Sequence, residues 1–175
     1  MVLLNSIFAK IFKKDLHKAI MTIGALYSGF SVFALLIVFM QKLSISSVED
    51  FADEEFMGLM NMLHSIWITY MPLLLLLGLT YVLFGFMYNK ITFNRFLINQ
   101  IISVLFIAWA VAYAYGSVDY IKIFVELIPF QNEIISTAMY VMTGVGFVVV
   151  FLFMSVPQYL IGKMIKAKDE MDTNK

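Results

Sequence analysis

Four long runs of apolar residues divide the chain, and none of them contains Asp, Glu, Lys or Arg. A helix needs about 20 such residues to cross a hydrocarbon core of roughly 30 Å, and each run reaches that length. The strands of a membrane barrel would alternate polar and apolar residues over about ten positions, which these runs do not do. We therefore predict an all-α membrane protein, a four-transmembrane-helix bundle that forms a single membrane domain over residues 1–175. The predicted spans are about 19–40, 65–88, 96–115 and 134–162.

The first run follows a stretch that mixes apolar residues with lysines. Across residues 2–18, apolar side chains recur near the helical spacing, and the lysines gather in the second half. This pattern is typical of an amphipathic helix in the membrane interface, held by apolar burial and by attraction to anionic lipid. We predict such a helix; the alternative is a basic flank that only obeys the positive-inside rule. The apolar positions are Leu4, Ile7, Phe8, Ile11 and Phe12.

The first run is longer than the apolar core of a signal peptide, which has about 7–15 residues, so we predict that it stays in the protein as a span. The loop after it, about residues 41–64, begins a helix in our interpretation, because Ser46 and Glu49 have the spacing of a capping box. An acidic cluster in this loop is a candidate site for a cation or a basic partner, with a solvated surface as the alternative. Its members are Asp53, Glu54 and Glu55.

The second loop expected on the same side, about residues 116–133, is unusually apolar. Tyr120, Ile121 and Phe124 have the spacing of one face of a short helix, which we expect to end before Pro129. These two loops are the sizeable surfaces that the predicted spans leave outside the membrane on that side. We therefore predict partner binding there, and the candidate residues are Tyr120, Ile121, Phe124, Glu126, Asp53, Glu54 and Glu55.

Composition supports a membrane location, because 62% of the residues are hydrophobic and only 14% are charged. A soluble chain has about 45–50% apolar and about 25% charged residues, and a small soluble domain has little interior in which to hide the excess. The net charge of +0 gives no reason to expect a nucleic-acid partner. The chain has no cysteine, which excludes disulfides, thiolate metal sites and cysteine nucleophiles.

The basic residues predict the orientation of the spans. With four spans, ten Lys and Arg residues lie on the side that holds both termini, and only Lys42 and Lys122 lie on the other. Because loops rich in Lys and Arg stay in the cytoplasm, we predict a multi-pass protein of a plasma (inner) membrane with cytoplasmic N- and C-termini.

Candidate chemistry is sparse. In this topology His17 and His64 lie at opposite faces of the membrane, so they cannot share a metal ion. We find no set of residues typical of a catalytic centre, and we expect no catalytic residues, no metal and no cofactor. Ion-coupled transport normally places a titratable group inside the membrane, and none of the predicted spans contains a charged residue.

A few uncharged residues within the spans are expected to join helices. Asn99 and Gln100 are adjacent, so they point about 100° apart on a helix and cannot both face lipid comfortably. We predict that they hydrogen-bond to another helix; the alternative is a pore- or substrate-lining role. Pairs such as Gly24 with Ser28 allow close helix packing, within one bundle or between subunits. Pro157 frees a backbone carbonyl that needs a local partner.

The overall plan resembles the immunity proteins that protect against pore-forming colicins of the colicin A type. The resemblance covers the whole chain as architecture: length, four spans, cytoplasmic ends, short inner loops and a lysine-rich tail. It implies a binding protein of the inner membrane and assigns no role to any single residue.

We therefore expect a small polytopic membrane protein that acts through protein–protein contacts, as an accessory subunit or an immunity-type protein of a membrane system. Its expected partners are the lipid bilayer and another membrane protein or a second copy of the chain, with no nucleic acid. The alternative is an oligomeric channel or pore, with the outer acidic residues attracting cations. A membrane-embedded enzyme is a third possibility, disfavoured because no catalytic set is found.

Overall fold

The computed structural model describes residues 15–45, 54–126 and 133–173, and within these ranges the regular structure is helical. The predicted amphipathic helix over residues 2–18 lies outside the described residues up to residue 14. The elements are α2 (Leu16–Ile45), α3 (Glu54–Met87), α4 (Arg95–Gly116), α5 (Val118–Glu126) and α6 (Glu133–Thr173).

Four of these segments are long and apolar enough to cross a membrane, which confirms the all-helical class and the number of candidate spans. The helices extend beyond the apolar runs. Residues 54–64 belong to the loop in which we expected a helix to begin, and they continue into α3 without a break, because helical hydrogen bonding does not stop where hydrophobicity does. The candidate spans are Leu16–Lys42, Met57–Met87, Arg95–Glu126 and Ser136–Glu170.

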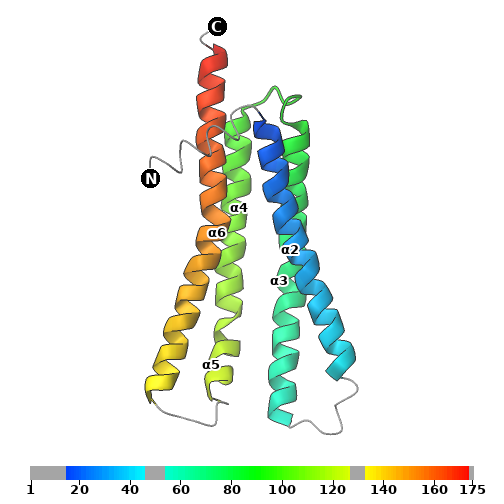
Figure 1. Cartoon of the computed structure of the whole chain (residues 1–175), viewed down its shortest axis with the longest axis vertical. Helices are drawn as coiled ribbons and strands as arrows, with labels where there is room; N and C mark the ends of the chain where they lie inside the picture. The colour runs from blue at the N-terminus through cyan, green and yellow to red at the C-terminus, as the bar shows by residue number, and fades with distance from the viewer. Residues whose placement is uncertain (1–14, 46–53, 127–132, 174–175) are drawn as a thin grey trace.

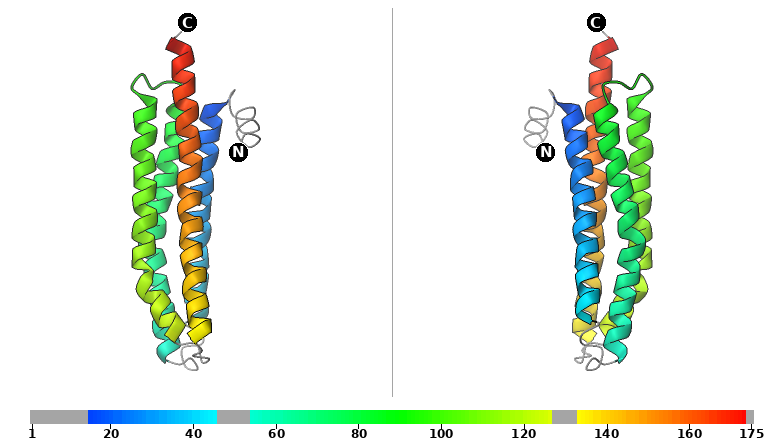
Figure 2. Two further views of the ribbon diagram at one scale, coloured as in Figure 1. Left: turned by 90° about the vertical axis from the view of Figure 1, so that its left-hand side faces the viewer. Right: turned by 90° about the vertical axis from the view of Figure 1, so that its right-hand side faces the viewer.

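The long helices stand side by side in two antiparallel pairs, α2 with α3 and α4 with α6 (Figure 1). The start of α2, the connection between α3 and α4, and the last part of α6 share one end, which we call the basic end (Figure 2). Helix α5 lies at the opposite end, called the α5 end below. The described basic residues of the basic end include Lys18, Lys90, Arg95, Lys163, Lys166 and Lys168.

Helices α2 and α3 approach each other closely at glycine residues. A Cβ atom added to Gly24 would lie 2.7 Å from the carbonyl oxygen of Gly78 and 2.7 Å from the backbone nitrogen of Val82. A Cβ on Gly78 would lie 2.8 Å from the backbone nitrogen of Ser28. The backbones touch only because both helices lack a side chain here. These small residues therefore pack within the chain, whereas Gly29 faces open space.

Aromatic rings fill the centre between the two helix pairs. The ring of Phe106 on α4 lies 4.8 Å from that of Tyr27 on α2 and 6.0 Å from that of Tyr81 on α3, measured between centroids. Phe153 on α6 meets Tyr27 edge-on at 5.5 Å. Each of the four long helices thus contributes one ring to a shared aromatic core, and tilted or edge-on pairs of this kind add about 0.5–1.5 kcal/mol beyond the buried area.

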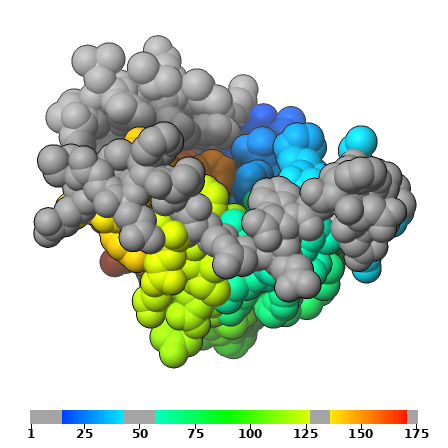
Figure 3. Space-filling view, turned by 90° about the horizontal axis from the view of Figure 1, so that it is seen from below, coloured from blue at the N-terminus to red at the C-terminus, as the bar shows by residue number. Residues whose placement is uncertain are grey.

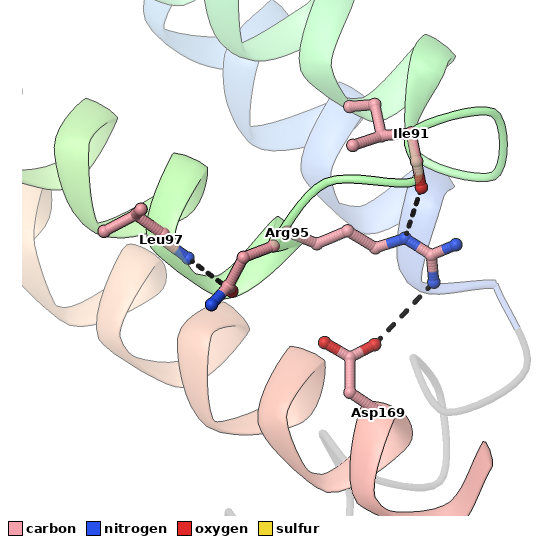
Figure 4. A network of polar contacts seen from close by, with 5 residues as sticks. Ile91, Arg95, Leu97 and Asp169 are labelled. Atoms are coloured by element: carbon pink, nitrogen blue, oxygen red, sulfur yellow. Dashed lines mark hydrogen bonds and ion pairs between the residues drawn. The ribbon is translucent and has the colours of Figure 1, made fainter. Parts of the chain in front are cut away.

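At the basic end, the first turn of α4 is tied to its surroundings by polar contacts (Figure 4). The side chain of Asn94 accepts a hydrogen bond from the backbone N–H of Leu97 at 3.0 Å and so caps the helix. The Nε of Arg95 donates to the carbonyl oxygen of Ile91 at 3.2 Å, and its Nη1 lies 3.7 Å from Oδ1 of Asp169 on α6. The connection after α3 is therefore held against both α4 and α6.

Candidate functional site

The two neighbouring amides on α4 differ in their surroundings. Asn99 is fully buried: its Oδ1 accepts a hydrogen bond from the hydroxyl of Tyr81 on α3 at 2.7 Å, and its Nδ2 donates to the carbonyl oxygen of Gln158 on α6 at 3.2 Å. Gln100 is half-buried. A Cβ on Gly162 would lie 3.1 Å from Nδ2 of Asn99 and 3.2 Å from Nε2 of Gln100. Asn99 thus joins three helices, and Gly162 leaves room for both amides.

The turn of α6 before Pro157 also accepts a hydrogen bond from another helix. Pro157 has no N–H, so the carbonyl oxygen of Phe153, four residues earlier, lacks its usual helical partner. The hydroxyl of Tyr27 on α2 donates to this oxygen at 2.9 Å. The bond satisfies the carbonyl in an apolar setting and links α2 with α6.

Two further bonds reach α3 beside Pro72, one from α2 and one from α4. The hydroxyl of Ser31 on α2 donates to the carbonyl oxygen of Met71, and Nε1 of Trp109 on α4 donates to that of Tyr70 at 2.7 Å. Together with the contacts of Asn99 and Tyr27, these bonds connect every pair of neighbouring long helices. Polar side chains of this kind stabilise the association of helices in a membrane, where lipid supplies no hydrophobic drive for helix packing.

A cleft of about 320 Å³ opens near the α5 end, between α3, α4, α5 and α6. Its surface is mostly apolar. Of its four hydroxyl residues, Ser117, Tyr120 and Thr143 lie on the side nearer the end of the molecule, and Tyr113 lies about one helical turn deeper on α4. Two of the predicted partner-binding residues, Tyr120 and Ile121, line it. The full lining is Leu63, Ile66, Trp67, Tyr113, Ser117, Tyr120, Ile121, Thr143, Gly146, Phe147 and Val150.

Helix α5 has one side against the other helices and one side outward. Val125 is buried, whereas Ile123, Phe124 and Glu126 are exposed. The ring of Phe124 stacks on that of Tyr120, with centroids 6.1 Å apart. Figure 3, which views the molecule from this end, shows the yellow-green α5 between the teal start of α3 and the yellow start of α6. The predicted partner residues of this loop are thus divided between the cleft and the outward side.

The acidic candidates are placed only in part. Glu54 and Glu55 begin α3, at the same end of the molecule as α5. Their side chains, and Asp53 as a whole, lie outside the described residues. His64 is buried on α3 towards this end, and His17 lies on the first turn of α2 at the basic end, so the structure does not bring the two histidines together.

Two cationic side chains lie close to the ring of Tyr88, which directly follows α3 at the basic end. The guanidinium carbon of Arg95 lies 4.8 Å from the ring centroid of Tyr88, and Nζ of Lys168 lies 5.3 Å from it. A cation close to an aromatic face is attracted by the negative potential of the ring. Sequence reasoning missed this cluster, because Lys168 and Arg95 are far apart along the chain.

Sequence reasoning also missed the residues that α3 and α6 supply to the cleft. A Cβ on Gly146 would meet nothing within 4 Å, and this glycine lines the cleft. No signal in the sequence pairs Trp67 with Gly146, because the pairing depends on how far α6 stands from α3.

Comparison of the chain with protein-family models, with curated proteins and with solved structures finds no match.

Proposed function

We propose that the chain is a multi-pass protein of a plasma (inner) membrane, whose four long helices form one bundle with both termini in the cytoplasm. It acts there through protein–protein contacts rather than catalysis, as an accessory subunit or an immunity-type protein. The observation that carries this proposal is the outward side of α5. Val125 anchors the helix, and the neighbouring Phe124 is presented away from the protein together with Ile123.

The exposed side chains of the long helices support a lipid environment. Each helix presents large apolar residues with exposed fractions between 60% and 74%, for example Phe33, Leu83, Val104 and Met142. In water, exposed apolar surface costs about 25 cal/mol per Å² relative to burial, so such a surface is unfavourable for a soluble monomer. In hydrocarbon the cost vanishes, and the internal hydrogen bonds of the helices satisfy the backbone.

The orientation can be tested with single cysteines, because the chain has none of its own. Asn89 is exposed in the connection at the basic end, and Lys122 is exposed on α5. We expect that Lys122→Cys reacts with a membrane-impermeant maleimide in intact cells, whereas Asn89→Cys reacts only after the cells are opened. Labelling of Asn89→Cys in intact cells would reverse the proposed orientation.

The partner contact can be tested with a photoreactive benzoyl-phenylalanine at position 124 and, as a matched control, at position 93. Phe124 and Phe93 are both exposed, by 38% and 64%, but lie at opposite ends of the molecule. We expect a crosslink to one membrane protein from position 124 and none from position 93. We also expect Phe124→Ser to weaken the complex tenfold or more, because loss of an aromatic anchor at an interface costs ~2 kcal/mol.

Two results would contradict this function. One is that position 93 crosslinks to the same proteins as position 124. The other is ion leakage from liposomes that contain only the purified chain, which would favour the oligomeric pore.

A further inference from the structure

The cleft near the α5 end has the depth of a membrane interface. Along α4, Tyr113 lies about 27 Å from Arg95, and along α6, Gly146 lies about 33 Å from Lys168, at a rise of about 1.5 Å per residue. A hydrocarbon core is about 30 Å thick. If the residues of the basic end lie at one boundary of the core, as the proposed membrane crossing requires, the cleft straddles the opposite boundary.

The polarity of the lining changes along this direction. Val150 on α6 and Ile66 on α3 lie deeper in the membrane than Thr143 and Leu63, because α6 runs from the α5 end towards the basic end, as does α3. Three of the four hydroxyl residues lie at the shallow end, the fourth, Tyr113, lies about one helical turn deeper on α4, and the deeper residues on α6, Phe147 and Val150, are apolar. A diacyl phospholipid has the same order, with ester groups at the boundary and methylene groups below it.

The size of the cleft suits one hydrocarbon chain. Its volume is about 320 Å³, whereas an apolar cavity of ~150 Å³ already holds a benzene molecule. Ligand sites in general begin at about 300 Å³. The apolar part of α6 contributes little to the protein interior: only 6% of its most apolar segment is buried. The structure therefore leaves space between α6 and α3 that hydrocarbon from the surrounding bilayer fills at no hydrophobic cost.

We propose that this cleft binds one acyl chain of a phospholipid from the leaflet at the α5 end, with its ester group beside Ser117 and Thr143. The methylene chain lies along Trp67, Phe147 and Val150. The bound chain bridges α6 to α3 where these helices make no direct close packing at Gly146. This site goes beyond the proposed partner contact, which uses the outward side of α5.

A glycine pair on α6 supplies the test variants. Gly144 and Gly146 both face open space, with nothing within 4 Å of an added Cβ, but only Gly146 lines the cleft. A phenylalanine at position 146 fills the cleft, and one at position 144 serves as a matched control of equal bulk. Because both positions are open, we expect both variants to fold, which the elution volume in detergent and the helical circular dichroism signal check.

The natural tryptophans supply the signal. The chain has two, of which Trp67 lines the cleft and Trp109 is buried beside Tyr113. The probe is a vesicle of phosphatidylcholine brominated on the upper half of its acyl chains, since bromine quenches tryptophan on contact. We expect quenching of about half of the emission, the share of Trp67, in the natural chain and in Gly144→Phe. We expect Gly146→Phe to lose most of this quenching.

A second measurement counts lipid directly. After extraction in mild detergent and gel filtration, native mass spectrometry should find a phospholipid on the natural chain and on Gly144→Phe, and none on Gly146→Phe. Equal quenching and equal lipid retention in all three proteins would overturn the proposal. So would a natural chain that is not quenched and elutes as a dimer, because a second copy would then occupy the cleft. Cysteine labelling at positions 89 and 122 tests the membrane crossing separately, so a failure of the cleft and a failure of the topology are distinguishable.

Discussion

Gly24→Ala will lower the free energy of unfolding by about 2–3 kcal/mol relative to Gly29→Ala, in the upper part of the range of about 1–3 kcal/mol expected when a methyl group is forced into packed structure. The new methyl group on Gly24 would lie 2.7 Å from backbone atoms of Gly78 and Val82, which cannot rotate away as a side chain can. Helices α2 and α3 must therefore move apart. Gly29 is on the same helix and meets nothing within 4 Å, so Gly29→Ala carries the same gain in helix propensity without the clash.

The measurement is reversible unfolding of the purified protein in mixed micelles, followed by circular dichroism as the share of denaturing detergent rises. Using the difference between the two alanine variants removes the effect of propensity and leaves the cost of separating the helices. Equal midpoints for Gly24→Ala and Gly29→Ala would show that α2 and α3 do not touch at Gly24 and Gly78.

Asn99→Leu will destabilise the protein by about 2 kcal/mol, because it leaves the buried hydroxyl of Tyr81 and the carbonyl oxygen of Gln158 without this partner. Tyr81→Phe removes only one of the two bonds, and we expect it to cost about 1 kcal/mol, within the range measured for hydrogen bonds between membrane helices. In the double variant, the loss should fall short of the sum by about 1 kcal/mol, because the two residues share a bond.

Thr80→Val is the matched control for this cycle. Thr80 is next to Tyr81, but its hydroxyl is exposed and donates to the carbonyl oxygen of Leu76 in its own helix at 2.8 Å. Because the carbonyl oxygen of Leu76 also accepts a backbone hydrogen bond within the helix, removal of the Thr80 hydroxyl should change stability by less than about 0.5 kcal/mol. If Asn99→Leu is as mild as Thr80→Val, then Asn99 is not a junction of three helices.

The two kinds of variant probe different interfaces. Gly24→Ala tests the pairing of α2 with α3, and Asn99→Leu tests the attachment of α4 and α6 to that pair. Since Val82, which the new methyl group would meet, directly follows Tyr81, the partner of Asn99, we expect the two effects on stability to be coupled by about 0.5 kcal/mol or more. Strict additivity would show that a shift of α3 at Val82 does not reach the bond between Tyr81 and Asn99.

How far the candidate site was predictable differs from residue to residue. The pattern of Tyr120, Ile121 and Phe124 predicts a short amphipathic helix after the third apolar run, and α5 occupies Val118–Glu126. The pattern cannot tell which of these side chains turns inward, because that depends on where α3 and α6 lie. In the structure Tyr120 and Ile121 line the cleft, whereas Phe124 is exposed.

The four long helices follow from the sequence alone, because hydrophobicity and length are local quantities that add up along a segment. Asn99 could likewise be recognised locally as a residue that needs a partner, since an amide within an apolar run is costly to leave unpaired. Only the tertiary structure decides that Tyr81 and Gln158 are those partners, that Gly24 meets Gly78, and that Gly146 borders a cleft. Those outcomes depend on the distance and rotation between helices, which are set jointly by all the packed side chains and by no single stretch of the chain.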